Sequence, residues 1–308
     1  MTPAWQVAVA GRDGTGESPF WHPAEERLYW VDIPARRVQR WHPASGRHEQ
    51  WQLPQEPGCI APAARGGLVL GLRDGIYRAH DWEEELVPLA LFRHGEHTRF
   101  NDGKADVLGR FWASTIYEPR DARKADLYCL DARPGVTGGK AIVQLKAHNA
   151  TTGNGLAFAP KADTLYWADT PSHAIQAWDW EPVANVMRRH RVFAQFPAKP
   201  AGWQPGDPGY GGRPDGAAVD AEGHYWCAMY EGGRLLRIAP DGRIAAQLPL
   251  PVRCPTMPCF GGPDLRTLYV TSARHGRPPQ ELAATPDAGC VFSTRVEVPG
   301  LPVNFFID

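Results

Sequence analysis

The sequence of 308 residues is nearly neutral, with 33 Lys and Arg residues against 34 Asp and Glu residues. It is 43% hydrophobic and 22% charged, the composition of an ordinary folded protein, which excludes a disordered chain. The balanced charge gives no basic face for nucleic acid or an anionic membrane, and no apolar run reaches the roughly 18 residues of a membrane-spanning helix.

The N-terminal segment, MTPAWQVAVAGRDG, lacks the basic and long apolar regions of an export signal, so we expect a cytoplasmic protein. Six cysteines are spread along the chain without a CxxC pair. In a chain of this length and expected location they are predicted to be free thiols in the core. They are Cys59, Cys129, Cys227, Cys254, Cys259 and Cys290.

Glycine and proline interrupt the chain throughout, with 32 glycines and 30 prolines. Proline breaks helices and glycine weakens them by about 1 kcal/mol, so we expect short strands joined by turns. A short aromatic and β-branched run recurs roughly every 48 residues, which is typical of propeller blades of four strands each. The runs are Leu28–Asp32, Leu68–Leu72, Arg110–Ser114, Leu165–Asp169, His224–Ala228 and Leu268–Ser272.

These six repeats predict an all-β fold, a six-bladed β-propeller in which residues 1–308 form a single domain. A large β-sandwich with accidental aromatic spacing is the alternative. A propeller closes by combining both chain ends in one blade, and Gln6–Ala10 and Val303–Phe306 are the predicted closing strands. The segment Gly202–Gly212 is so rich in glycine and proline that it is predicted to be a loop.

Common catalytic signatures are missing from the sequence, which has no Walker loop, HExxH or GxSxG motif. His94 and His97 lie three residues apart in a turn-like segment without a third ligand nearby, so we expect a solvated loop there. Gly211–Gly216 is rich in glycine but lacks the spacing of a dinucleotide-binding loop.

Polar residues embedded in apolar sequence remain at the starts of strands in four of the repeats. They are Glu17, Asn101 with Asp102, Asn154 and Asp215. Each alone is more often a turn-forming residue than a ligand, but equivalent positions in a propeller converge on its central channel. We therefore predict one shared site. Its carboxylate and amide oxygens suit a hard divalent cation such as Ca²⁺, Mg²⁺ or Mn²⁺ and argue against a Cys/His zinc site.

At these segments the sequence resembles the SMP-30/gluconolactonase/regucalcin family of six-bladed propellers, from Gly16 to about Arg274. The motifs that carry the resemblance are GESPFW, RFNDGKAD followed by GRFWAS, NGLAFAP, RPDGAAVDAEGHYW and CFGG. The resemblance implies hydrolysis of a sugar lactone, an aldono-1,4- or 1,5-lactone, to its aldonic acid with one divalent cation. Whether that cation is Ca, Mg, Mn, Zn or Fe stays open.

Roles for individual residues follow from the same motifs. By motif match Glu17, Asn154 and Asp215 look like the metal ligands. Arg99 and Asn101 look like the substrate-binding pair, since an arginine offers a rigid fork of donors to sugar hydroxyls.

The general base has two candidates, because a carboxylate beside the metal can take a proton from water. Asp215 is the first, and Asp102 is the second because ligation lowers the basicity of a carboxylate. Some relatives carry an acidic pair after the third-repeat strand, where Glu118 stands here as a candidate substrate contact.

Two other functions compete with a monomeric lactonase that takes a small-molecule sugar lactone and neither nucleic acid nor membrane. One is an organophosphate or ester hydrolase on the same propeller, against which Arg99 and the polar loops weigh. The other is a non-catalytic, metal-binding regulatory propeller. Loss of Glu17 or Asp215 would mark that protein, and both residues are present.

Overall fold

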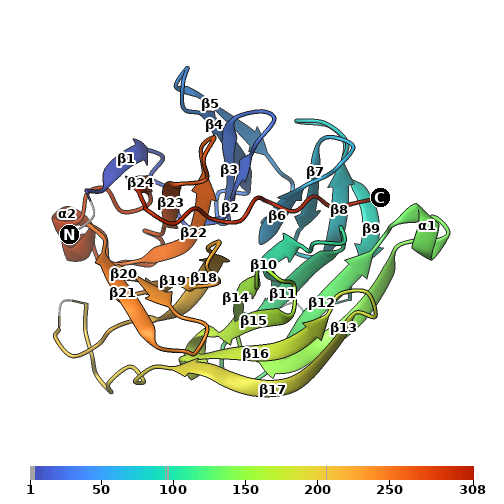
Figure 1. The fold of residues 1–308 in the computed structure, drawn as a ribbon. Helices are drawn as coiled ribbons and strands as arrows, with labels where there is room; N and C mark the ends of the chain where they lie inside the picture. Colours follow the sequence, from blue (N-terminus) through green and yellow to red (C-terminus); the bar gives the residue numbers. More distant parts are fainter. Residues whose placement is uncertain (1–3, 94, 96, 206) are drawn as a thin grey trace.

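Six four-stranded antiparallel sheets surround a central axis in the computed structural model, which describes residues 4–93, 95, 97–205 and 207–308 (Figure 1). Each sheet is one blade, and the blades follow one another along the chain. The first blade holds β2 (Gly16–His22), β3 (Arg27–Asp32), β4 (Arg37–His42) and β5 (Arg47–Gln52). The second holds β6 (Cys59–Pro62), β7 (Leu68–Gly71), β8 (Gly75–Ala79) and β9 (Val87–Leu91). The third holds β10 (Thr98–Ala105), β11 (Phe111–Tyr117), β12 (Ala125–Asp131) and β13 (Ile142–Ala150).

The other three blades complete the ring. The fourth blade holds β14 (Gly153–Phe158), β15 (Thr164–Asp169), β16 (Ala174–Glu181) and β17 (Val186–Gln195). The fifth holds β18 (Arg213–Val219), β19 (Tyr225–Tyr230), β20 (Arg234–Ile238) and β21 (Ile244–Pro249). The sixth holds β22 (Pro255–Gly261), β23 (Thr267–Ser272), β24 (Val291–Arg295) and β1 (Gln6–Val9). Among the described residues, three short helices lie outside the blades: α1 (Pro134–Thr137), α2 (Pro279–Ala284) and the 3-10 helix η1 (Thr170–Ser172).

The repeated aromatic runs are the second strands of the blades, so the six-bladed prediction is confirmed. In β3 and β15 every residue after the first is buried, because a second strand packs between neighbouring blades on both faces. This burial explains a continuous apolar run in place of alternation. The outermost strands β5 and β17 are largely exposed and polar, and their sequences show no repeat.

The closing blade confirms one predicted strand and corrects the other. Gln6 of β1 pairs with Ser293 of β24, so the N-terminal strand closes the sixth blade. Val303–Phe306 was wrongly predicted to join it. The segment 301–308, which we call the C-terminal strap, crosses one face of the propeller (Figure 1), where Phe306 forms a parallel bridge with Ala63 of the second blade. In the sixth sheet, β1 already pairs with the outer edge of β24, so that edge is not open to the strap.

Several smaller predictions have outcomes in the fold. All six cysteines are unpaired and buried, as predicted. Residues 196–205 and 207–212 between β17 and β18 hold no strand, as expected for the segment Gly202–Gly212. The solvated loop predicted at His94–His97 includes residues 94 and 96, which lie outside the described residues. Among the described helices, none is long and apolar enough to cross a membrane.

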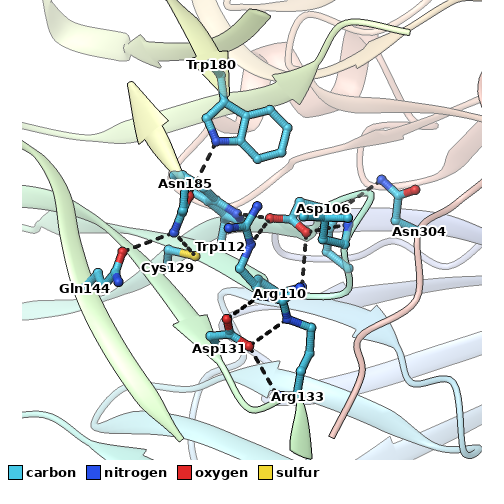
Figure 2. A network of polar contacts seen from close by, with 12 residues as sticks. Asp106, Arg110, Trp112, Cys129, Asp131, Arg133, Gln144, Trp180, Asn185 and Asn304 are labelled. Atoms are coloured by element: carbon cyan, nitrogen blue, oxygen red, sulfur yellow. Dashed lines mark hydrogen bonds and ion pairs between the residues drawn. The ribbon is translucent and has the colours of Figure 1, made fainter. Parts of the chain in front are cut away.

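A buried aspartate at the turn into the second strand holds the third blade together (Figure 2). The carboxylate of Asp106 accepts hydrogen bonds from two backbone N–H groups of its own turn, from Arg110 Nε at 2.6 Å and from Trp112 Nε1 at 2.7 Å. Asp220 in the fifth blade makes equivalent contacts. Its carboxylate accepts hydrogen bonds from two backbone N–H groups of its own turn and from the indole of Trp226. The repeated spacing of aspartate, glycine and tryptophan therefore has a structural cause.

Replacing Asp106 by alanine is expected to destabilise the protein by roughly 3–5 kcal/mol, because a buried guanidinium and an indole N–H lose their partner. The free energy of unfolding from urea titration measures this. Asp241→Ala is the matched control. That exposed aspartate accepts a hydrogen bond from Arg243 N and lies 3.9 Å from Arg243 Nε, so its loss should cost at most about 1 kcal/mol. Equal losses in the two variants would contradict the account.

An apolar cavity of about 290 Å³ occupies the channel beside the strap. Its walls include Phe20, Phe158 and Phe260 from the later part of the innermost strands, with Leu301 and Val303 of the strap. None of the five polar candidates at the start of these strands lines it. The cavity nevertheless borders the candidate site, because Ser18 and Gly103, which directly follow Glu17 and Asp102, line it.

Candidate metal centre

An irregular register in the innermost strands positions the candidate residues. In five blades the pairing of the innermost with the second strand shifts at the same place. A bulge of this kind re-aims side chains that a regular strand would turn into its neighbours. The shifts lie between Glu17 and Phe20, Phe100 and Gly103, Asn154 and Ala157, Pro214 and Ala217, and Pro255 and Pro258.

Three carboxylates from three blades come together at these shifts. Glu17, Asp102 and Asp215 are all buried. Burial raises the pKa of Glu17, and the charges of Asp215 and Asp102 raise it further. Burial likewise raises the pKa of Asp215 to about 8, with Arg213 opposing and Asp102 adding to the effect. The predicted convergence of distant segments is therefore present in the fold.

The amide of Asn154 is oriented by a chain of hydrogen bonds. Asn101 Nδ2 donates to Asn154 Oδ1 at 2.9 Å, and Asn154 Nδ2 donates to Thr170 Oγ1 at 2.8 Å. Thr170 Oγ1 in turn donates to the carbonyl of Pro214, next to Asp215. The Asn154 oxygen therefore faces Asn101. Sequence reasoning missed Thr170, whose only signal was its place directly after the run Leu165–Asp169.

Arg99 and Glu118 lie together at the entrance to this group. Arg99 Nη1 donates to Asn101 Oδ1 at 3.0 Å, and its Nε lies 3.4 Å from Glu118 Oε1. Arg73 of the second blade also binds Glu118, at 3.0 and 3.1 Å, and Glu56 at 3.0 Å. Two arginines thus hold the Glu118 carboxylate. Arg73 was not predicted, because it lies outside the motifs that carry the family resemblance.

Asp102 sits deeper and has one free oxygen. Its Oδ2 accepts a hydrogen bond from Leu156 N at 2.8 Å, whereas its Oδ1 is buried and has no hydrogen-bond partner. Gly155 makes this packing possible at φ +59°, since a Cβ there would collide with the hydroxyl of Tyr225, which donates to the Gly155 carbonyl at 2.6 Å. An unpartnered buried carboxylate oxygen marks a place where a positive group or a proton donor fits.

The donor set fits a hard divalent cation. Within the described residues, no three His, Cys, Asp or Glu side chains are grouped to hold a metal ion by themselves. A centre here would therefore combine the carboxylates of Glu17 and Asp215 with the amide oxygen of Asn154, and such oxygen sets suit Ca²⁺, Mg²⁺ or Mn²⁺. Burial, together with the charge of Asp102, raises the pKa values of Glu17 and Asp215, and a bound cation would favour the ionised form of both carboxylates.

The chain is similar to known proteins over most of its length. Residues 15–274 match the family model described as SMP-30/Gluconolactonase/LRE-like region. A 6-deoxy-6-sulfogluconolactonase of Pseudomonas putida is 43% identical over 294 residues, covering 94% of each chain. Regucalcin of Danio rerio is 32% identical over 304 residues, covering 96% of each chain.

The fold itself is shared with a solved relative. The crystal structure of regucalcin, a calcium-binding protein from Agrobacterium tumefaciens, superposes with a TM-score of 0.87 at 26% identity. The match covers 99% of this chain and 97% of that chain. Together with the six blades and the motifs at their inner strands, these matches establish that the chain belongs to the SMP-30/gluconolactonase/LRE-like family.

Proposed function

We propose that this protein is a metal-dependent lactonase that opens a sugar lactone, an aldono-1,4- or 1,5-lactone, to its aldonic acid. The observation that carries the proposal is the convergence of Glu17, Asn154 and Asp215 from three blades beside the Arg99–Asn101 pair. The 43% identical lactonase relative supports it.

Each residue has a distinct task in this reaction. A divalent cation held by Glu17, Asn154 and Asp215 would polarise the lactone carbonyl and stabilise negative charge on its oxygen. Arg99 donates to the sugar hydroxyls with the guanidinium N–H groups that Asn101 and Glu118 leave free.

Proton transfer falls to the carboxylates. As water attacks the carbonyl carbon, Asp215 takes its proton, with Asp102 as the second candidate. The bond between the carbonyl carbon and the ring oxygen then breaks, and the ring oxygen takes a proton to become a hydroxyl.

A panel of lactones tests the proposal. Acid release from pentono- and hexonolactones, including 6-deoxy-6-sulfogluconolactone, would be followed with a pH indicator on metal-stripped protein. Ca²⁺, Mg²⁺, Mn²⁺, Zn²⁺ and Fe²⁺ would then be added singly. We expect metal-dependent hydrolysis above the spontaneous rate. Stoichiometric metal binding without hydrolysis of any lactone would overturn the proposal and favour a binding protein.

Replacing Arg99 by alanine is expected to lower kcat/KM by roughly 10- to 100-fold while leaving metal binding intact, because it removes charge-assisted hydrogen bonds to substrate. Lactone hydrolysis and calorimetric titration with the metal measure the two effects. Loss of the metal from this variant would show that Arg99 supports the ligands instead of the substrate.

A further inference from the structure

The apolar cavity beside the strap contains one charged side chain. The cavity is lined by the innermost strands of all six blades and by the strap. Among the described residues, Lys104 of β10 is the only charged one that lines it, so no carboxylate faces the ammonium from the walls. Most of the other side chains in the walls are aliphatic or aromatic. Such walls suit an apolar ligand better than a sugar lactone, whose hydroxyl groups would lose their hydrogen bonds to water there.

The Lys104 ammonium has no partner in the part of the chain that the structure describes. No hydrogen bond, ion pair or ring contact with another described residue involves it. Asp102 and Glu17 of the neighbouring site favour its charged form from a distance, but neither forms an ion pair with it. Since a charged group inside a protein is normally paired, this ammonium is available to a ligand.

The serine and the asparagine in the walls already have partners. Ser18 Oγ donates to the carbonyl of Ile60 at 3.3 Å and accepts a hydrogen bond from Ile60 N at 2.9 Å. Asn304 Nδ2 of the strap donates to the carbonyl of Ala105 at 3.3 Å. Neither side chain engages Lys104, whose N–H donors are left for a ligand.

The charge of Lys104 acts across the cavity. Cys259 of β22 lines the cavity from the sixth blade, whereas Lys104 lines it from the third. Burial raises the pKa of the Cys259 thiol to about 12, and the charge of Lys104 opposes this rise. Burial also lowers the pKa of Lys104, because the ammonium has lost water without gaining a counterion. An anion beside the ammonium would offset this loss.

We propose that this cavity binds a small monocarboxylate with an apolar body, separately from the metal centre. The carboxylate pairs with the Lys104 ammonium, and the apolar body packs against Phe20, Phe158 and Phe260. The cavity volume of about 290 Å³ is at the lower limit of small-molecule sites, which are about 300–1,000 Å³, so the ligand is small. Leu301 of the strap forms part of the wall, so the ligand also contacts the strap. This site does not depend on the proposed lactonase function.

Calorimetric titration tests the site with two acids, octanoate and phenylacetate, and with their neutral amides. Wild-type protein, with and without metal, is expected to bind each acid at least about 10-fold more tightly than its amide. Lys104→Met keeps the apolar stem and is expected to raise Kd for the acids by at least about 10-fold, with less than about a threefold change for the amides. Lys161→Met is the matched control, because Lys161 is exposed between the lining residues Pro160 and Ala162 without lining the cavity itself. It should change every Kd by less than about threefold.

Equal affinities of the acids and their amides for the wild type would overturn the inference, and this comparison does not require any variant to fold. No binding of either acid, unchanged affinity in Lys104→Met or an equal loss in Lys161→Met would overturn it as well. Binding of the acids that disappears when the metal is removed would place them at the metal centre and contradict a separate site. None of these results would decide whether the protein hydrolyses lactones.

Discussion

Replacing Asp215 by alanine is expected to lower metal-dependent lactone hydrolysis by at least about 10³-fold, because one substitution removes both a metal ligand and the proposed base. The side chain is buried at a register shift of β18, and this burial, with the charge of Asp102 adding to it, raises its pKa to about 8. Alanine also relieves repulsion there, so the fold should persist. Lactone turnover with saturating metal and a thermal melt measure the two effects.

Asp102→Asn is the comparison that separates the two carboxylates. This variant keeps the proposed ligands Glu17, Asn154 and Asp215, and is expected to bind metal and to retain activity within about 10-fold of the wild type. A greater loss in Asp102→Asn than in Asp215→Ala would transfer the role of base to Asp102, whose Oδ1 has no hydrogen-bond partner.

Replacing Glu17 by glutamine is expected to change stability in opposite directions with and without metal. In the metal-free protein the variant should melt at a higher temperature than the wild type, because the charges of Asp215 and Asp102 no longer oppose a buried carboxylate. With metal at 100 times its dissociation constant, the wild type should gain about 2.7 kcal/mol. Glutamine keeps an oxygen but loses the charge, so most of this gain should vanish.

Thermal melts at several metal concentrations, together with calorimetric titration, measure this reversal in the order of the two melting temperatures. The amide can still accept the hydrogen bond that Ser18 N now donates to Glu17 Oε2, so local geometry is preserved. An undiminished metal-dependent rise in melting temperature for Glu17→Gln would remove Glu17 from the ligand set.

The blade count was predictable from sequence because it depends on burial that repeats. The second strands pack on both faces, so their apolar runs recur in each blade. The end of the ring was less predictable. Gln6–Val9 joined the sixth sheet as predicted, whereas Val303–Phe306, rich in β-branched and aromatic residues like a strand, forms part of the strap. Strand-like sequence alone does not reveal which neighbour has a free edge.

The main residues of the predicted site lie close together because equivalent positions in the blades of a propeller converge on its central axis. Glu17, Asp102 and Asp215 lie within electrostatic reach of one another, and Asn101 contacts Asn154. What the sequence could not reveal were contacts that depend on loop paths. Thr170 reaches Asn154 through η1, and Arg73 reaches Glu118 from another blade. The register shifts were also invisible, since a bulge depends on pairing with the adjacent strand.

The strap has a consequence for how the molecule comes apart. The ring is closed where β1 pairs with β24. The strap makes a second closure elsewhere: Arg78 Nε binds Asp308 Oδ2 at 2.8 Å, and Ile307 N donates to the carbonyl of Gly109. Both seals join segments far apart in sequence, so each closes late in folding, after a large loop entropy has been lost. Interactions that form after the folding barrier slow unfolding more than they speed folding. The contacts of the strap are therefore expected to prolong the lifetime of the closed ring by slowing its unfolding.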